Sequence, residues 1–143
     1  MINDIINGIA SALHQRFGAE YAIYKEDISQ GFTEPCFSIV LIRSEKVPYL
    51  KNRYLLKHRF DVHFFPKPGK NKKSECYDVA DTLHSTLEYI NVLDFSFRGT
   101  KMTSEIVDGV LHFFVEYDKF IGVAQEAESQ FMESLTNNLI VEE

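Results

Sequence analysis

Apolar side chains recur at helical spacing in two separate segments of the chain. The first begins after Asn3, which is positioned as an N-terminal cap, and ends before Gly18, which is positioned as a C-terminal cap. The second begins after Ser74, another capping residue. The pattern therefore predicts two amphipathic helices. Their apolar faces comprise Ile5, Ile6, Ile9, Ala10, Leu13 and Phe17, and then Cys76, Val79, Ala80, Leu83, Leu87 and Ile90.

Between these helices the pattern changes to that of β-strands. A short strand is predicted at residues 21–25, followed by a loop. Residues 36–43 (CFSIVLIR) are rich in β-branched and aromatic residues without a polar alternation, which predicts a strand that is buried on both faces and central in a sheet. Residues 53–65 alternate, which predicts a long two-faced strand. Its apolar face holds Tyr54, Leu56, His58, Phe60, Val62 and Phe64, and its polar face holds Lys57, Arg59, Asp61 and His63.

The last third of the chain again has strand character. Residues 92–99, 100–107 and 110–121 predict three strands. The dipeptide Asp108-Gly109 joins the last two, and this pair is typical of a tight hairpin because a type I′ turn needs positive φ at both central residues.

After Gly122 the composition shifts, and residues 124–139 (AQEAESQFMESLTNNL) predict a third helix. The predicted order is α-β-β-β-α-β-β-β-α, which indicates an α+β fold with a mainly antiparallel sheet packed with helices. We expect one domain over residues 1–122. Residues 123–143 are expected to form a helical extension that packs on the same domain or on another subunit.

Composition fits one globular domain. The chain has 143 residues, of which 45% are hydrophobic, and a net charge of −6. No apolar run approaches the roughly 18 residues of a membrane-spanning helix, and the start, MINDIINGIA, lacks the basic residues of a signal peptide, so a cytoplasmic location is expected. Cys36 and Cys76 lack metal-site spacing and are expected to be reduced and buried.

Charge is distributed unevenly along the chain. Residues 51–73 contain eight basic residues and one acid, and residues 104–143 contain nine acids and one lysine. Such a separation favours contacts with partners of opposite sign, including other copies of the chain in a ring or filament. The alternative is that both segments are solvated surface, which is the usual case for runs of charge. The basic segment, which includes the exposed-loop sequence PKPGKNKK, could also bind nucleic acid, although the acidic chain as a whole argues against that role.

No catalytic motif or metal-ligand set is recognisable in the sequence. His58 and His63 are five residues apart on one strand and so point to opposite faces, and His112 and Glu116 share a face but lie apart along it. The two cysteines fit small core residues better than nucleophiles. We therefore expect no enzyme activity, no cofactor and no metal.

Three segments carry a family resemblance. GFTEPCFSI (31–39), NRYLLKHRFDVHFFP (52–66) and RGTKMTSEIVDGVLHFFVEYDKF (98–120), following an MINDIINGIASAL helix, resemble the tail terminator proteins of phages, prophages and phage-tail-like particles of Gram-positive bacteria. The resemblance implies a virion structural protein, assembled in the host cytoplasm, that forms a six-subunit ring. This ring would cap the head-proximal end of the tail tube, end its polymerisation and dock the head or neck. The implied partners are other copies of the chain, the tail tube protein and a connector, with DNA passing as cargo.

The charge pattern gives candidate residues for the ring contact. A basic side is expected to face acids of residues 104–143, and an apolar stripe in the predicted third helix is expected to anchor the contact. Alternatives are a head-tail connector or neck protein, or a nucleic-acid-binding module that uses the lysine-rich loop 66–73. The interface candidates are Arg53, Lys57, Arg59, Lys67, Lys70, Lys72, Lys73, Glu126, Glu128, Phe131, Met132 and Leu135.

Overall fold

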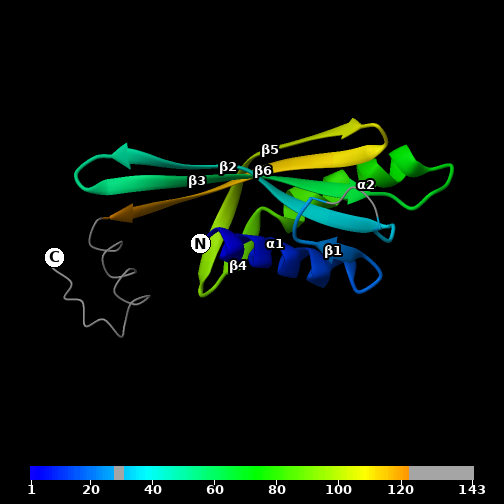
Figure 1. Ribbon diagram of the computed structural model, residues 1–143, viewed down its shortest axis with the longest axis horizontal. Coiled ribbons are helices and arrows are strands. Elements are labelled where there is room, and N and C mark those ends of the chain that lie inside the picture. Colours follow the sequence, from blue (N-terminus) through cyan, green and yellow to red (C-terminus); the bar gives the residue numbers. More distant parts are fainter. Residues whose placement is uncertain (28–30, 123–143) are drawn as a thin grey trace.

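The computed structural model describes residues 1–27 and 31–122, which form two helices and six strands (Figure 1). The predicted α+β class is confirmed. The predicted third helix at residues 124–139 lies outside the described residues. The elements are α1 (Ile2–Phe17), β1 (Ala22–Tyr24), β2 (Cys36–Tyr49), β3 (Arg53–Phe65), α2 (Lys72–Thr86), β4 (Tyr89–Val92), β5 (Phe95–Val107) and β6 (Val110–Gly122).

The strands form one sheet in the order β1-β2-β3-β6-β5-β4. β1 pairs parallel with β2, and all the other pairs are antiparallel. Two long hairpins, β2–β3 and β5–β6, therefore make up most of the sheet, and β3 and β6 lie at its centre. The β2–β3 hairpin extends away from the two helices in Figure 1.

Both helices contribute to a single core against one face of the sheet. The apolar stripe of each helix packs against alternate residues of the central strands. Each element thus presents one apolar face to the same core, the helices with a period of 3.6 residues and the strands with a period of two. Each fully buried large apolar side chain contributes about 1.5–3 kcal/mol. The largest fully buried side chains are Tyr117, Phe37, Phe60, Phe64, Phe113, Ile5, Ile9, Leu13, Ile39, Leu83, Leu87 and Ile90.

The hairpin turns follow from local backbone chemistry. Asp108 (φ 52°) and Gly109 (φ 79°) both have positive φ, and Val107 pairs with Val110, so the predicted tight turn of the β5–β6 hairpin is confirmed. The β2–β3 turn uses Lys51 and Asn52, also at positive φ. Its sequence contains no glycine, so the turn was not predicted.

The predicted helix starts were wrong at both helices. α1 begins at Ile2, so Asn3 lies inside it, and α2 begins at Lys72, so Ser74 lies inside that helix. Neither helix has a side-chain hydrogen bond at its N-terminal cap. Gly18 is the C-terminal cap of α1 as predicted. Ile90 belongs to β4, because α2 ends four residues earlier, at Thr86.

Three strand predictions needed correction. β2 continues through the polar stretch to Tyr49 and lies second from the edge of the sheet, although its first residues are buried as predicted. The predicted strands 92–99 and 100–107 are largely one strand, β5, and its predicted break is a bulge between Thr100 and Thr103. A second irregularity lies in β2 between Leu41 and Arg43. Bulges keep a strand in its sheet while shifting the side-chain alternation.

Cys36 and Cys76 are free and buried, as expected. Burial raises the pKa of the Cys36 thiol to about 11, with a smaller contribution from Glu34, and burial also raises the pKa of Cys76. Both thiols therefore stay protonated near neutral pH and are poor nucleophiles. Among the described residues, no helix is long and apolar enough to span a membrane.

Candidate functional site

One face of the sheet lies opposite the helices, and we call it the open face. It carries the odd-numbered residues of β3 and the even-numbered residues of β6, because their neighbours along each strand point into the core. Within the part of the chain that the structure describes, no helix covers it. Register places three polar pairs across its centre: Lys57 opposite Asp118, Arg59 opposite Glu116, and His63 opposite His112.

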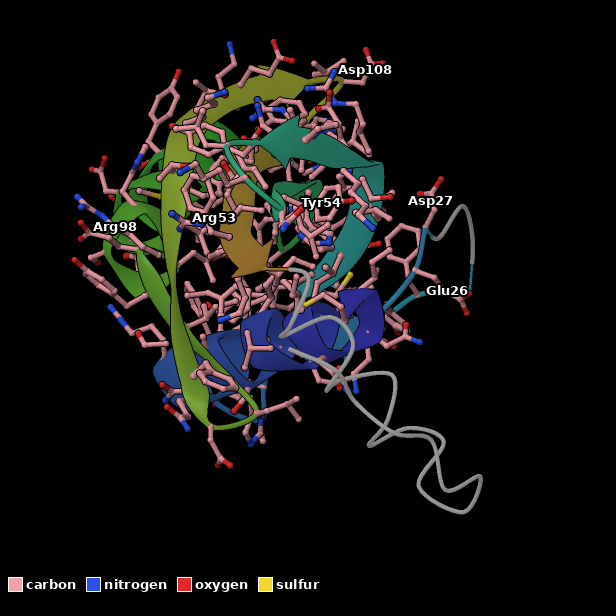
Figure 2. The ribbon with its side chains drawn as sticks, turned by 90° about the vertical axis from the view of Figure 1, so that its left-hand side faces the viewer. Glu26, Asp27, Arg53, Tyr54, Arg98 and Asp108 are labelled. Carbon is pink, nitrogen blue, oxygen red and sulfur yellow. The ribbon has the colours of Figure 1, made fainter. Side chains whose placement is uncertain are left out.

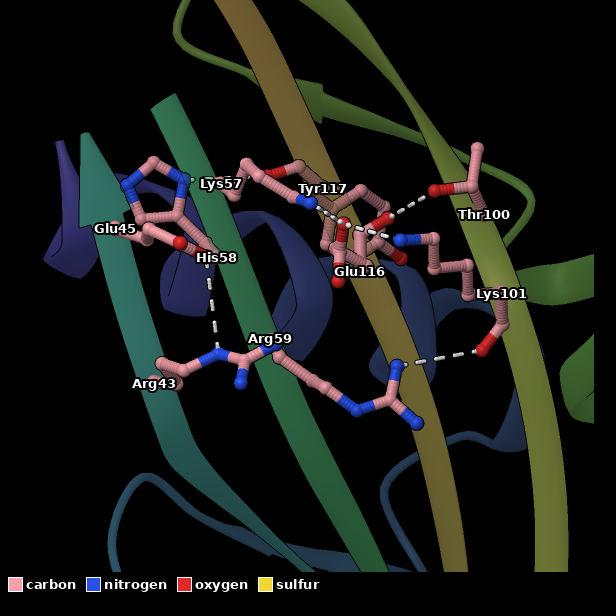
Figure 3. Close-up of polar contacts among 9 residues, drawn as sticks. All are labelled: Arg43, Glu45, Lys57, His58, Arg59, Thr100, Lys101, Glu116 and Tyr117. Carbon is pink, nitrogen blue, oxygen red and sulfur yellow. Dashed lines mark hydrogen bonds and ion pairs between the residues drawn. The ribbon is translucent and has the colours of Figure 1, made fainter. Parts of the chain in front are cut away.

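Glu116 is the centre of a charged cluster on the open face (Figure 3). Only 1% of this residue is exposed. Its Oε2 atom lies 3.7 Å from Nζ of Lys57 and 3.6 Å from Nζ of Lys101, and the Thr100 hydroxyl donates a hydrogen bond to its backbone carbonyl at 3.2 Å. The two lysine side chains thus cover a carboxylate that would otherwise face water.

Arg59 extends the cluster toward β5. Its guanidinium donates a hydrogen bond to the backbone oxygen of Lys101 at 3.5 Å and lies 5.4 Å from the ring centroid of Phe114. The side chain is thus held by both a polar contact and a cation–π contact. Arg59 and Lys57 are therefore engaged within their own chain rather than extended into solvent.

Asp118 adds a second acid beside Glu116. Burial, a hydrogen bond with Glu116 and the charge of Glu116 raise the pKa of Asp118 to about 6, although Lys57 and Lys101 oppose the shift. Among the described residues, Oδ1 of Asp118 is buried without a hydrogen-bond partner. This corner of the open face therefore brings two carboxyl groups close together beside two lysines, and the proximity of Glu116 favours the protonated form of Asp118.

A second polar group lies further along the same two strands. Oδ2 of Asp61 is 2.9 Å from Nε2 of His63 and 2.9 Å from Nδ1 of His112. We call these three residues the Asp-His-His cluster. Sequence reasoning compared histidines within single strands and missed it, because the cluster depends on the register between β3 and β6.

The remaining histidine of β3 has a structural environment. His58 is 4% exposed on the core face, as its register with the apolar set predicted, and its Nδ1 lies 3.2 Å from the backbone oxygen of Tyr117. Burial lowers the pKa of His58. The Tyr117 hydroxyl donates to the backbone oxygen of Leu87 at 2.7 Å, and burial raises its pKa. These groups satisfy one another inside the core.

The turn of the β2–β3 hairpin exposes apolar side chains, and we call residues 49–53 the hairpin tip. Leu50 is 72% exposed and Tyr49 is 51% exposed. The ring of Tyr49 packs edge-on against Phe120 at 5.0 Å, and the Arg53 guanidinium lies 5.1 Å from the Phe120 ring centroid. Figure 2 views the molecule from this end, where Arg53 and Tyr54 are labelled. Apolar side chains gathered at an exposed end are typical of a protein contact.

The structure separates the predicted basic interface into three places. Arg53 lies at the hairpin tip, Lys57 and Arg59 lie in the open face, and the remaining lysines lie beyond the other end of β3. The exposed loop predicted at residues 66–73 is shorter than expected: residues 67–71 are exposed loop, Pro66 is buried, and Lys72 and Lys73 begin α2. The lysines in and just after it are Lys67, Lys70, Lys72 and Lys73.

The predicted acidic side is only partly described. Glu105 and Lys73 line one pocket between α2 and β5, so residues of opposite charge from the two segments lie near one another within one chain. Glu116 is likewise covered by lysines of its own chain. The other interface candidates, Glu126, Glu128, Phe131, Met132 and Leu135, lie outside the described residues.

Together these features define an α+β protein whose distinctive surfaces are a polar sheet face, a projecting apolar hairpin tip and a lysine-rich loop. A model of the family described as phage tail terminator protein matches residues 4–130, and the chain belongs to this family. It is accordingly a structural protein of the phage tail, a virion component that interacts with other tail and head components. The match extends beyond Gly122 into the predicted C-terminal extension. A search of curated proteins found no match.

Proposed function

We propose that this protein caps the head-proximal end of a phage tail tube, ends the polymerisation of the tube and provides the surface to which the head or neck docks. Membership in the tail terminator family supports this role. Capping needs no chemical reaction. It needs one surface that binds the last ring of tube protein and, on the opposite side, a different surface to which further tube subunits cannot bind.

The hairpin tip is the observation that carries the proposal. A 14-residue and a 13-residue strand hold Leu50 and Tyr49 away from the helices, where these side chains can enter a neighbouring molecule. Burying an exposed leucine and a tyrosine contributes a few kcal/mol to binding. Long paired strands keep such an anchor rigid, which lowers the entropy lost on binding.

In this proposal the charged groups set the orientation of neighbouring subunits in a ring. Arg53 and the lysines of residues 67–73 are exposed. In this proposal they pair with acids of residues 104–143 in an adjacent copy of a ring. Exposed ion pairs add under about 1 kcal/mol each, so they select the orientation while apolar contacts supply affinity. The ring leaves a channel for DNA, and the net negative charge of the chain limits adhesion of that DNA.

The test is a capping assay. The protein is mixed with polymerising tail tube protein from the same gene cluster, and tube lengths are measured by negative-stain electron microscopy. We expect short tubes of uniform length with density at one end. Unchanged tubes would contradict the capping role and favour a head-tail connector or neck protein.

A matched pair of variants tests the hairpin tip. Leu50→Asp places a charge in the proposed contact, whereas Leu93→Asp places one in the β4–β5 turn at an equally exposed leucine (72% and 74%). Capping is expected to fail with Leu50→Asp and to persist with Leu93→Asp. Equal behaviour of the two variants would remove the hairpin tip from the interface.

A further inference from the structure

The Asp-His-His cluster places three potential metal ligands on neighbouring strands. His63 and His112 are directly opposite each other across the β3–β6 pair, and Asp61 lies two residues before His63 on the same face. One ligand atom from each residue lies within 4.8 Å of the others. Opposed residues on a sheet are held by the strand pairing, so the arrangement does not depend on a loop.

Asp61 has an unsatisfied oxygen. The residue is only 8% exposed, its Oδ2 contacts both histidines, and its Oδ1 is buried with no hydrogen-bond partner in the part of the chain that the structure describes. A buried carboxylate oxygen without a partner is costly, by about 1–3 kcal/mol, and in native proteins it calls for an explanation. A cation bound at this carboxylate removes that cost.

The donor types indicate the kind of cation. Two imidazole nitrogens and one carboxylate oxygen favour zinc and similar divalent transition metals over magnesium or calcium, which prefer oxygen ligands. Zinc–nitrogen bonds are about 2.0–2.1 Å long, which puts ligand atoms about 3.3 Å apart in a tetrahedral site. The three donor atoms already lie within 4.8 Å of one another, so small side-chain rotations bring them to that spacing.

The surroundings allow an ion to enter and to stay. The His112 side chain is 22% exposed and that of His63 is 13% exposed, so water reaches the cluster from the open face. Glu105 lies opposite His112 on the other side, in the β5–β6 register, and adds negative charge nearby. The nearest cation along β3, Arg59, is directed to the Lys101 backbone and the Phe114 ring.

We propose that Asp61, His63 and His112 form a binding site for one divalent transition metal ion, with zinc as the best match, which ties β3 to β6 at the centre of the sheet. Three protein ligands leave a fourth position for water or for a group from another molecule. The proposal rests on these residues alone and does not depend on the capping role.

The test is zinc titration of the full-length chain by isothermal titration calorimetry. We expect one zinc ion per chain. His63→Ala, His112→Ala and Asp61→Asn are each expected to weaken zinc binding at least about tenfold, since loss of even an outer-shell partner costs 10–100-fold. His14→Ala, which removes an exposed histidine from α1, is the control and should bind zinc like the wild type. No zinc binding, or binding unaffected by the β3 and β6 variants, would overturn the site.

A measurement on the unaltered chain keeps the test independent of variant folding. Imidazole nitrogen resonances are recorded by NMR during zinc addition. The His63 and His112 resonances should shift together and saturate at one equivalent, while those of His14, His58 and His84 stay in place. Shifts confined to the other histidines would also overturn the proposal.

Discussion

Glu116 shows how a buried charge is retained at the level of single residues. Its carboxylate is nearly inaccessible to water, and Lys57 and Lys101 are the cations paired with it. The two lysines are not equivalent, because 24% of the Lys57 side chain is exposed and 61% of that of Lys101. The more buried cation faces less solvent screening and contributes more.

Replacing each lysine by methionine separates these contributions. Lys57→Met should lower the free energy of unfolding by about 1–3 kcal/mol, because it leaves the buried Glu116 carboxylate without the more buried of its two lysine partners. Lys101→Met should cost less than about 1 kcal/mol. Urea denaturation of both variants measures the difference, and equal losses would contradict the unequal roles.

Asp118 gives a pH dependence with a defined sign. Its folded-state pKa is raised from 3.8 to about 6, so the folded chain holds a proton on this group that the unfolded chain has already released. The contribution of Asp118 to stability is therefore present below pH 4 and falls as the pH rises through 6. Asp118→Asn, which mimics the protonated form, should match the wild type at pH 4 and be more stable by about 1 kcal/mol at pH 7.5, a modest gain because water partly screens the site. Urea unfolding at both pH values checks this, and parallel pH profiles for the two proteins would refute it.

At the scale of elements, the approach of α1 to β4 depends on one missing side chain. A Cβ atom at Gly8 would lie 2.7 Å from the backbone oxygen of Asn91 and 3.2 Å from Cγ2 of Val92. The strand backbone cannot yield as a flexible side chain would. The helix therefore lies closer to the sheet edge than any other residue at this position would allow.

Gly8→Ala is expected to reverse the usual effect of this substitution. In an exposed helix, alanine stabilises relative to glycine by about 0.5–1 kcal/mol. Here overpacking against β4 should destabilise the fold by about 1–3 kcal/mol. Ser11→Ala, at an exposed position of α1, is the control and should be neutral or slightly stabilising. Thermal unfolding of both variants tests the contact, and a stabilised Gly8→Ala variant would rule it out.

Element types were predictable from the sequence, but several boundaries were not. Helical and strand periods identify α1, α2 and β3 because each buries one face. β5 was predicted as two strands because a bulge between Thr100 and Thr103 interrupts the alternation without ending the strand. Ile90 continued the helical spacing of α2 by coincidence and is buried from β4 instead.

At the scale of the whole molecule, surfaces were harder to predict than the core. The exposed lysine loop was identified from its composition, because proline, glycine and lysine cannot be buried together. Burial of Glu116 and the contact of His63 with His112 depend on which strands pair and in what register. That information is absent from local patterns. The sequence alone also did not indicate that Lys57 would be engaged by an acid of its own chain.

The net charge of the molecule bears on how it treats DNA. Four lysines at residues 67–73 would lose about a hundredfold in affinity between 50 and 200 mM salt if they were the main phosphate contacts. For a structural component with a net charge of −6, we expect no salt-dependent binding of free duplex. Fluorescence anisotropy of labelled duplex DNA at the two salt concentrations distinguishes these outcomes, and a steep salt dependence would favour the nucleic-acid-binding alternative.

The bulged strands β2 and β5 also affect how readily copies of the chain pair through their sheet edges. β1 pairs with β2 only as far as Ser38, and β4 pairs with β5 only as far as Arg98. Beyond these residues, the outer edges of β2 and β5 are not covered by β1 and β4. Each unpaired stretch contains a bulge, and the one in β2 also contains Pro48, which has no N–H to donate. Neither edge offers a flat template for strand addition. These features disfavour edge-to-edge strand addition between copies of the chain, which is the route to amyloid-like fibres.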